Sequence, residues 1–141
     1  MKKLPISVEN FKEIVKGGYY YVDKSLLIKD VIELPGKVKL ITRPRRFGKT
    51  LNIDMMMKFF SIDEVENLFE NLKIWNEKEI VKEYYRKYPV IYVSFKSLKG
   101  SNRKDAYERV KNELSRIPGR YKNEIKNKGY RRYYTAPLKK R

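Results

Sequence analysis

The spacing of apolar residues along the chain predicts a succession of helices and short strands. Over 49–60, Leu51, Met55 and Phe59 recur at four-residue intervals, with further apolar residues beside them. A helix with this pattern is expected to be buried on more than one side and to pack against a sheet. Similar spacing predicts helices over 8–16, 26–34, 65–72, 76–88 and 102–117, and short apolar runs predict strands over 19–22, 37–42 and 90–95.

Residues with strong capping or helix-breaking preferences flank several of these segments. Ser61 and Glu64 form a capping-box pattern before the helix predicted over 65–72. The other signals are Gly17-Gly18 and Pro118-Gly119 as helix ends, Asp23 or Ser25 as the cap of the second helix, and Ser101 or Asn102 as the cap of the last. We therefore expect one domain over 1–117 and a basic, irregular segment over 118–141.

The composition restricts the chemistry that the chain can perform. Its 141 residues include no cysteine and no histidine, which excludes thiolate or imidazole metal sites, Cys or His nucleophiles and disulfides. The net charge is +17, from 34 Lys and Arg against 17 Asp and Glu, so polyanions or nucleotide phosphates would be attracted. Neither a secretory leader nor a membrane-spanning run is visible, and a cytoplasmic protein with no membrane partner is expected.

The segment RPRRFGKT, residues 43–50, lies between a predicted buried strand and a predicted buried helix. Strand, loop and helix in this order are the context of a P-loop. Gly48 would let the backbone turn so that amides at the head of the helix point at an anion, and Lys49 would reach the β- and γ-phosphates. Thr50 would coordinate Mg²⁺ through its hydroxyl.

The predicted nucleotide site extends over the residues around this glycine. Its cofactor-binding residues are Arg45, Arg46, Phe47, Gly48, Lys49, Thr50 and Leu51, with Thr50 also the predicted metal ligand. The general P-loop pattern has glycine where this chain has Arg43. The alternative interpretation is a surface loop whose arginines and lysine are solvated charges ahead of a core helix.

Three segments together resemble the AAA-ATPase-like family of bacterial and archaeal predicted ATPases. They are FKEIVKGGYYYVDKSLLIKDVIE, KVKLITRPRRFGKTLNIDMMMKFF and PVIYVSFKSLK, and the resemblance runs from about Leu4 to Leu114. In that family the turn is itself similar to RPRRFGKT, which implies that Arg43 is a family feature. The resemblance implies ATP with Mg²⁺ as the ligand. With the strands above, the expected fold is α/β, a partial P-loop three-layer sandwich whose parallel sheet is flanked by helices.

The YYVDK segment, Tyr20 to Lys24, has two interpretations. By similarity to related ATPases it lies near the adenine or orients the P-loop. Alternatively, it is an ordinary strand end at which Asp23 caps the following helix.

Hydrolysis requires acids that hold Mg²⁺ and orient water, and we find none at the end of a suitable strand. The strand predicted over 90–95 ends in Phe95 and Lys96, while Asp54, Asp63, Glu64 and Asp105 fall in or beside predicted helices. The family's corresponding strand lies beyond the last predicted helix. We therefore expect ATP binding with little or no hydrolysis, leave enzymatic activity open, and hypothesise a truncated or frameshifted end.

The basic end of the chain provides a competing function. Ten basic residues and one acid lie between Arg116 and Arg141, interleaved with tyrosines. Such a segment either binds single-stranded nucleic acid through stacking and phosphate contacts or is a solvated charged tail. The alternatives to nucleotide binding are thus a non-enzymatic nucleic-acid module and a non-functional remnant.

Overall fold

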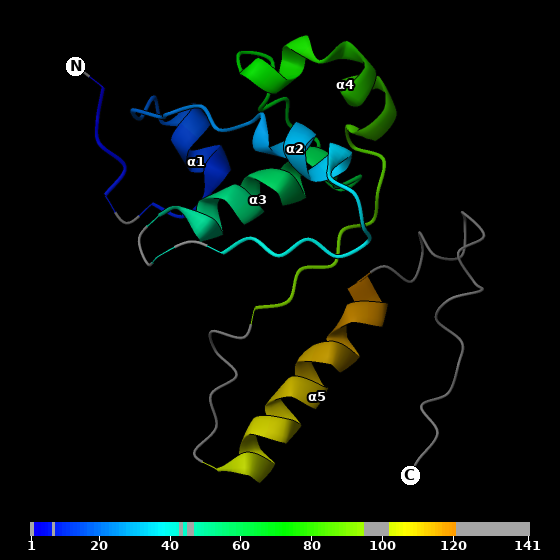
Figure 1. Ribbon diagram of the computed structural model, residues 1–141. Coiled ribbons are helices and arrows are strands. Elements are labelled where there is room, and N and C mark those ends of the chain that lie inside the picture. The colour runs from blue at the N-terminus through cyan, green and yellow to red at the C-terminus, as the bar shows by residue number, and fades with distance from the viewer. Residues whose placement is uncertain (1, 7, 43, 45–46, 95–101, 121–141) are drawn as a thin grey trace. The chain divides into compact units, whose positions relative to one another are not determined.

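The structure is a computed structural model that describes residues 2–6, 8–42, 44, 47–94 and 102–120. The chain forms two compact units, Met1–Val90 and Ile91–Arg141. The helices are α1 (Phe11–Lys16), α2 (Leu27–Glu33), α3 (Lys49–Phe60), the short 3-10 helix η1 (Lys73–Asn76), α4 (Lys78–Tyr84) and α5 (Arg103–Arg120) (Figure 1). All but α5 belong to the first unit.

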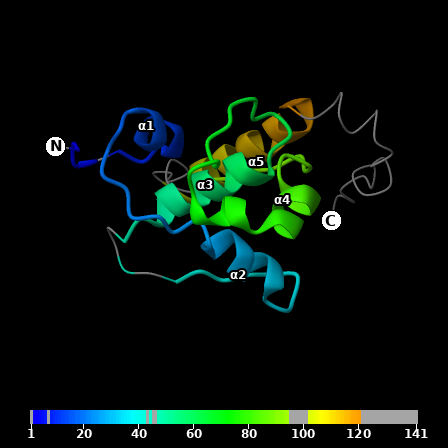
Figure 2. The same cartoon turned by 90° about the horizontal axis from the view of Figure 1, so that it is seen from above.

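Helix α3 is the centre of the first unit, with α1, α2 and α4 around it (Figure 2). Its Met55 and Phe59 are fully buried, as the apolar spacing predicts. The ring of Phe59 meets that of Phe69 edge to face at 5.2 Å, and Phe69 in turn lies 5.2 Å from Phe11 of α1. The core cluster is completed by Ile28, Leu68 and Ile74. The predicted extent of the helix over 49–60 is therefore confirmed, but it packs on helices and turns and not on a sheet, and Ile53 is 40% exposed.

The predicted α/β fold is wrong for the described part of the chain, which is helical and contains no sheet. The only backbone bridge of strand type among the described residues joins Ser61 to Tyr88 in parallel, and it is isolated. Apolar periodicity favours an extended backbone, but a sheet also needs a paired neighbour, which spacing alone does not supply. Residues 37–42 have no such neighbour, and Val38 and Leu40 are 88% and 86% exposed.

The capping-box prediction at Ser61 and Glu64 is also wrong, because no helix follows over 65–72. The hydroxyl of Ser61 accepts a hydrogen bond from the Asp63 amide at 3.1 Å, and the carboxylate of Glu64 accepts one from the Glu66 amide at 3.1 Å. These side chains stabilise consecutive turns instead of a helix start. The helix predicted over 76–88 is likewise shorter, because within that range only α4 is an α-helix, and η1 ends at Asn76.

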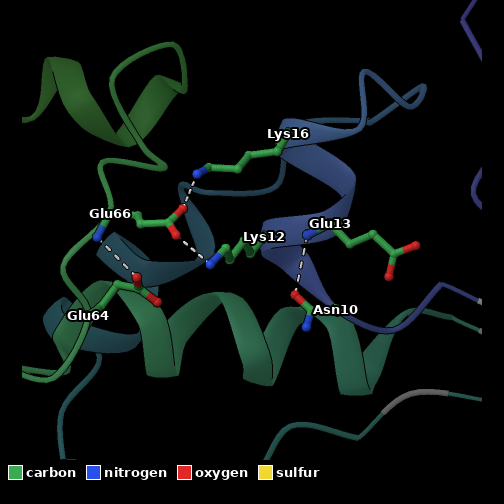
Figure 3. A network of polar contacts seen from close by, with 6 residues as sticks. All are labelled: Asn10, Lys12, Glu13, Lys16, Glu64 and Glu66. Atoms are coloured by element: carbon green, nitrogen blue, oxygen red, sulfur yellow. Dashed lines mark hydrogen bonds and ion pairs between the residues drawn. The ribbon is translucent and has the colours of Figure 1, made fainter.

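The turn segment after α3 is tied to α1 by Glu66. Its carboxylate forms ion pairs with Lys12 and Lys16, which lie one turn apart on α1 (Figure 3). These ion pairs, the Lys12 hydrogen bond above all, hold the pKa of Glu66 below its ordinary value. At the start of α1, the side chain of Asn10 accepts a hydrogen bond from the Glu13 amide at 3.3 Å, and Gly17 ends the helix. The predicted first helix is therefore confirmed, with a later start.

The second unit contains α5. The side chain of Asn102 accepts a hydrogen bond from the Asp105 amide at 2.9 Å, so Asn102 caps this helix, and Ser101 lies outside the described residues. The backbone continues in helical form to Arg120, past the predicted end at Pro118. Proline is expected to end a helix because it has no amide hydrogen to donate and its ring crowds the carbonyl four residues earlier, so the prediction from Pro118 is wrong for the backbone of this helix. Among the residues that the structure describes, no helix has the length and apolar character to cross a membrane.

Candidate functional site

Gly48 begins α3 in a left-handed conformation, with φ 71° and ψ 23°. L-residues rarely adopt this conformation, so glycine is required by the backbone. No heavy atom of the described residues lies within 4 Å of where a Cβ would stand, and Gly48 has no side chain that could cap the helix. The first-turn amides of a helix have no partner within the helix. Among the described residues, space is therefore left beside Gly48, and the helix dipole there favours an anion.

Lys49 lies in the first turn of α3 and reaches back over the preceding loop. Its ammonium donates a hydrogen bond to the carbonyl of Pro44, with Nζ and O 3.2 Å apart. The side chain is half-buried, so the positive charge is held beside the loop and not extended into solvent. A triphosphate on the loop would meet this ammonium without a large movement of the lysine.

The other predicted site residues differ in what the structure says of them. Thr50 is exposed on the first turn of α3, Phe47 is 56% exposed, and Leu51 is half-buried against the core. Leu51 also lines the smaller of the two cavities beside this helix start. Arg45 and Arg46, together with Arg43, lie outside the described residues.

Two cavities flank the first turns of α3, and Asn52 lines both of them. The larger, of about 330 Å³, lies toward α2 and the 37–42 segment and includes Lys39, Lys49 and aliphatic side chains. The smaller, of about 230 Å³, includes Gly48, Tyr20 and Tyr21. Concave surface therefore lies beside Gly48 and beside Lys49.

Asp23, in the YYVDK segment, and Ser25, just after it, accept hydrogen bonds from backbone amides. The carboxylate of Asp23 accepts hydrogen bonds from the amides of Ser25 and Lys73, both at 2.8 Å, and the buried hydroxyl of Ser25 accepts one from the Ile74 amide at 3.1 Å. These residues join the start of α2 to η1. The N-terminal position of α2 belongs to Leu26 and has no side-chain cap hydrogen bond, so the predicted caps Asp23 and Ser25 are wrong.

The electrostatics of Asp23 follow from these contacts. Burial acts to raise the pKa of its carboxyl group, but the hydrogen bonds from Lys73 and Ser25 and the charge of Lys73 outweigh burial. The pKa of Asp23 is therefore below its ordinary value, and the carboxylate is ionised at neutral pH. Sequence reasoning missed this role, because the partner at Lys73 lies 50 residues away.

The acids considered for catalysis serve other contacts. Asp54 of α3 accepts a hydrogen bond from the Phe11 amide at 2.7 Å and pairs with Lys58 at 3.4 Å. Glu64 bonds to its own turn, Asp63 is exposed, and Asp105 pairs with Arg109 in the second unit at 3.0 Å. Within the described ranges, no group of three or more acidic side chains is arranged to hold a metal ion.

The arrangement at the head of α3 fits a phosphate group. Backbone amides, the ammonium of Lys49 and the exposed Thr50 all belong to the first turn of this helix, and these are the kinds of group that bind phosphate and its metal ion. For Mg²⁺ the site offers the Thr50 hydroxyl, with the remaining coordination left to phosphate oxygens and water. Of the basic segment from Arg116 to Arg141 that is predicted to contact nucleic acid, 116–120 belong to α5 and 121–141 lie outside the described residues.

Comparison with known proteins adds a family to this geometry. A family model described as "Predicted AAA-ATPase" matches residues 5–140, nearly the whole chain. A protein of Azotobacter chroococcum mcd 1, named "Uncharacterized protein in vnfD 5'region", is 38% identical over 95 residues, which is 67% of this chain. That match covers 17% of the length of the relative. No solved structure matches the chain significantly.

Proposed function

Because this chain belongs to the predicted AAA-ATPase-like family, we propose that it binds the triphosphate of ATP, as the Mg²⁺ complex, at the head of α3. The observation that carries the proposal is the left-handed Gly48 at the start of a buried helix, with the Lys49 ammonium folded over the same loop. ATP is named from the family. The phosphate site is argued from the geometry.

Each residue of the loop has a physical role in this proposal. Gly48 supplies the backbone turn, and the amides of the first turn of α3 donate to phosphate oxygens. The ammonium of Lys49 exchanges the Pro44 carbonyl for the β- and γ-phosphates. Thr50 holds Mg²⁺, while Arg45, Arg46 and the backbone of Phe47 and Leu51 are proposed as further contacts.

We also propose that this chain hydrolyses ATP slowly or not at all. The carboxylates of Asp54 and Asp23 accept hydrogen bonds from backbone amides, that of Phe11 for Asp54 and those of Ser25 and Lys73 for Asp23. An acid engaged in this way is not positioned to orient an attacking water or to hold a metal ion. Binding without turnover is therefore the expected behaviour of the isolated chain.

A thermal-shift titration with MgATP tests the binding proposal. Ligand that binds only the folded state raises the melting temperature, and at a fixed ligand concentration the rise is larger when binding is tighter. We expect Lys49→Ala to weaken ATP binding by about tenfold or more, because a charged hydrogen bond is lost. Lys87 is a matched control, since its ammonium also donates to a backbone carbonyl, that of Lys82 at 2.7 Å, but away from the loop. The proposal is wrong if ATP stabilises both variants equally, and Mg²⁺-dependent turnover that Lys49→Ala abolishes would contradict the proposed lack of hydrolysis.

A further inference from the structure

The larger cavity beside α3 lies between that helix, α2 and the 37–42 segment, the cyan trace in Figure 1. Four of its lining residues share one face of α3, because they are spaced three, four and seven positions from the first: Lys49, Asn52, Ile53 and Met56. Its volume of about 330 Å³ lies within the usual range for small-molecule sites, about 300–1,000 Å³. The cavity is therefore large enough to hold a small ligand.

The 37–42 segment turns alternate side chains toward this cavity. Val38 and Leu40 are 88% and 86% exposed, whereas Lys39 is half-buried and Ile41 is 37% exposed. Successive side chains of an extended backbone point to opposite sides, and it is Lys39 and Ile41 that line the cavity. The segment thus contributes one cation and one aliphatic side chain to the wall.

Most of the wall is aliphatic and remains partly accessible. Val31 of α2 and Met56 of α3 are half-buried, and Ile41 and Ile53 are 37% and 40% exposed. Transfer of apolar surface from water to such a wall is favourable in proportion to the area covered. A hydrocarbon group in the cavity would therefore be stabilised by these four side chains.

The charged side chains of the lining are both cations, Lys39 and Lys49, and no acid lines the cavity. Among the described residues, the ammonium of Lys39 donates to the carbonyls of Leu34 and Gly36 and pairs with no carboxylate. An ammonium has three N–H donors, so one of them is left for a ligand. A positive charge beside an aliphatic wall suits a ligand that joins an anion to a hydrocarbon chain.

We propose that this cavity binds a medium-chain carboxylate, with the carboxylate group on Lys39 and the hydrocarbon chain against Val31, Ile41, Ile53 and Met56. A hydrogen bond from an ammonium to a carboxylate is stronger than one to a neutral carbonyl. A bare phosphate would leave the aliphatic wall uncovered, and a neutral chain would leave the cation without a charged acceptor. The site does not depend on nucleotide binding, so the proposal stands or falls separately from the proposed function.

Calorimetric titration of the full chain with hexanoate, octanoate and decanoate, below the concentrations at which they form micelles, tests the proposal. We expect affinity to rise about fourfold with each added methylene, because each one is transferred from water to the apolar wall. 1-Octanol has the same chain length without the charge, and it should bind about tenfold more weakly than octanoate. Acetate carries the charge without the chain and should not bind measurably.

Two pairs of variants locate the site. Ile41→Ser should weaken octanoate binding by about tenfold, because part of the aliphatic wall is lost. Leu40→Ser changes the neighbouring residue, which does not line the cavity, and should bind octanoate as the unaltered chain does. Lys39→Met removes the ammonium but keeps an unbranched chain, so octanoate should then bind no more tightly than 1-octanol. Lys37→Met, at an exposed lysine of the same segment, controls for the loss of one charge.

Each of the other outcomes overturns the proposal. If 1-octanol binds the unaltered chain as tightly as octanoate does, the cavity is an apolar surface without an anion site. If Leu40→Ser weakens binding as much as Ile41→Ser, or Lys37→Met as much as Lys39→Met, the ligand is not held in this cavity. Absence of saturable binding of decanoate refutes the site outright. A melting curve for each variant shows that the compared proteins are folded.

Discussion

The carboxylate of Asp54, in α3, accepts a hydrogen bond from the backbone amide of Phe11, 2.7 Å away and 43 residues earlier in the chain. Phe11 is the first residue of α1, and its side chain is fully buried. The hydrogen bond joins α3, which carries the proposed phosphate site, to α1, which packs against α3. An acid that resembles a catalytic candidate in the sequence is therefore a structural contact.

Replacing Asp54 by alanine tests this role. The change leaves the Phe11 amide without its acceptor, and we expect a loss of about 1–3 kcal/mol in the free energy of unfolding. Asp54→Asn should lose less, because an amide oxygen can still accept the bond. Denaturant unfolding measures both changes. Nucleotide affinity should be retained in Asp54→Asn, and a large loss there with stability preserved would point to a direct role in the site.

Local periodicity was sufficient to predict α3. This twelve-residue helix has three apolar residues at four-residue intervals, Leu51, Met55 and Phe59, and its predicted bounds agree with the structure. Periodicity was insufficient for the sheet, because strand pairing depends on residues far apart in the sequence. The capping-box prediction at Ser61 and Glu64 was wrong for a different reason. Their side chains can bond to nearby amides in a turn as readily as at a helix start, and the sequence pattern does not distinguish the two.

The left-handed Gly48 gives a prediction with a matched control elsewhere in the same unit. Gly48→Ala places a Cβ on a residue with φ 71°, which costs roughly 1–2 kcal/mol. Gly18→Ala introduces nearly the same strain, at φ 65°, and at both positions the Cβ would meet no atom within 4 Å. We expect equal losses of stability from the two changes, measured by denaturant unfolding.

Only Gly48→Ala should also weaken nucleotide binding. The strain at residue 48 would be relieved by a movement of the proposed phosphate loop, whereas the strain at residue 18 would not. Titration of both variants with MgATP provides the comparison. Equal affinities in the two variants would show that the conformation of Gly48 is not used for binding.

The part of the candidate site that consists of consecutive residues could be predicted from the sequence. Gly48, Lys49 and Thr50 are consecutive, so their placement at a helix start follows once α3 is identified. The role of Asp23 could not be read in this way. Its partner Lys73 begins η1, between two segments for which helices were predicted, and no spacing rule connects Lys73 with Asp23.

The lowered pKa of Asp23 predicts a dependence of stability on pH. A carboxyl group with a folded-state pKa below its unfolded value, about 3.9, contributes stability above that value and loses it as the pH falls through the folded pKa. Asp23→Ala removes the acceptor of both amides. We expect it to cost about 1 kcal/mol at neutral pH, after allowance for solvent screening of a partly exposed group.

The difference between Asp23→Ala and the unaltered chain should shrink below about pH 4, as the carboxylate of the unaltered chain becomes protonated. Denaturant unfolding across this range measures the difference. Asp63→Ala, at an exposed acid outside this network, provides the baseline. A difference that stays constant down to the acid limit would show that the charge of Asp23 contributes nothing.

The unpaired 37–42 segment gives the last prediction. Leu40 is 86% exposed, whereas Phe59 is fully buried among aromatic rings. Leu40→Ser should therefore change the free energy of unfolding by less than about 0.5 kcal/mol, while Phe59→Ala should cost about 3–5 kcal/mol through the cavity it leaves. A strand in the middle of a sheet would be buried on both faces, and a serine there would be strongly destabilising. A large loss in Leu40→Ser, measured by the same unfolding experiment, would thus show that this segment is covered in solution and that the helical arrangement described for residues 2–90 is incomplete.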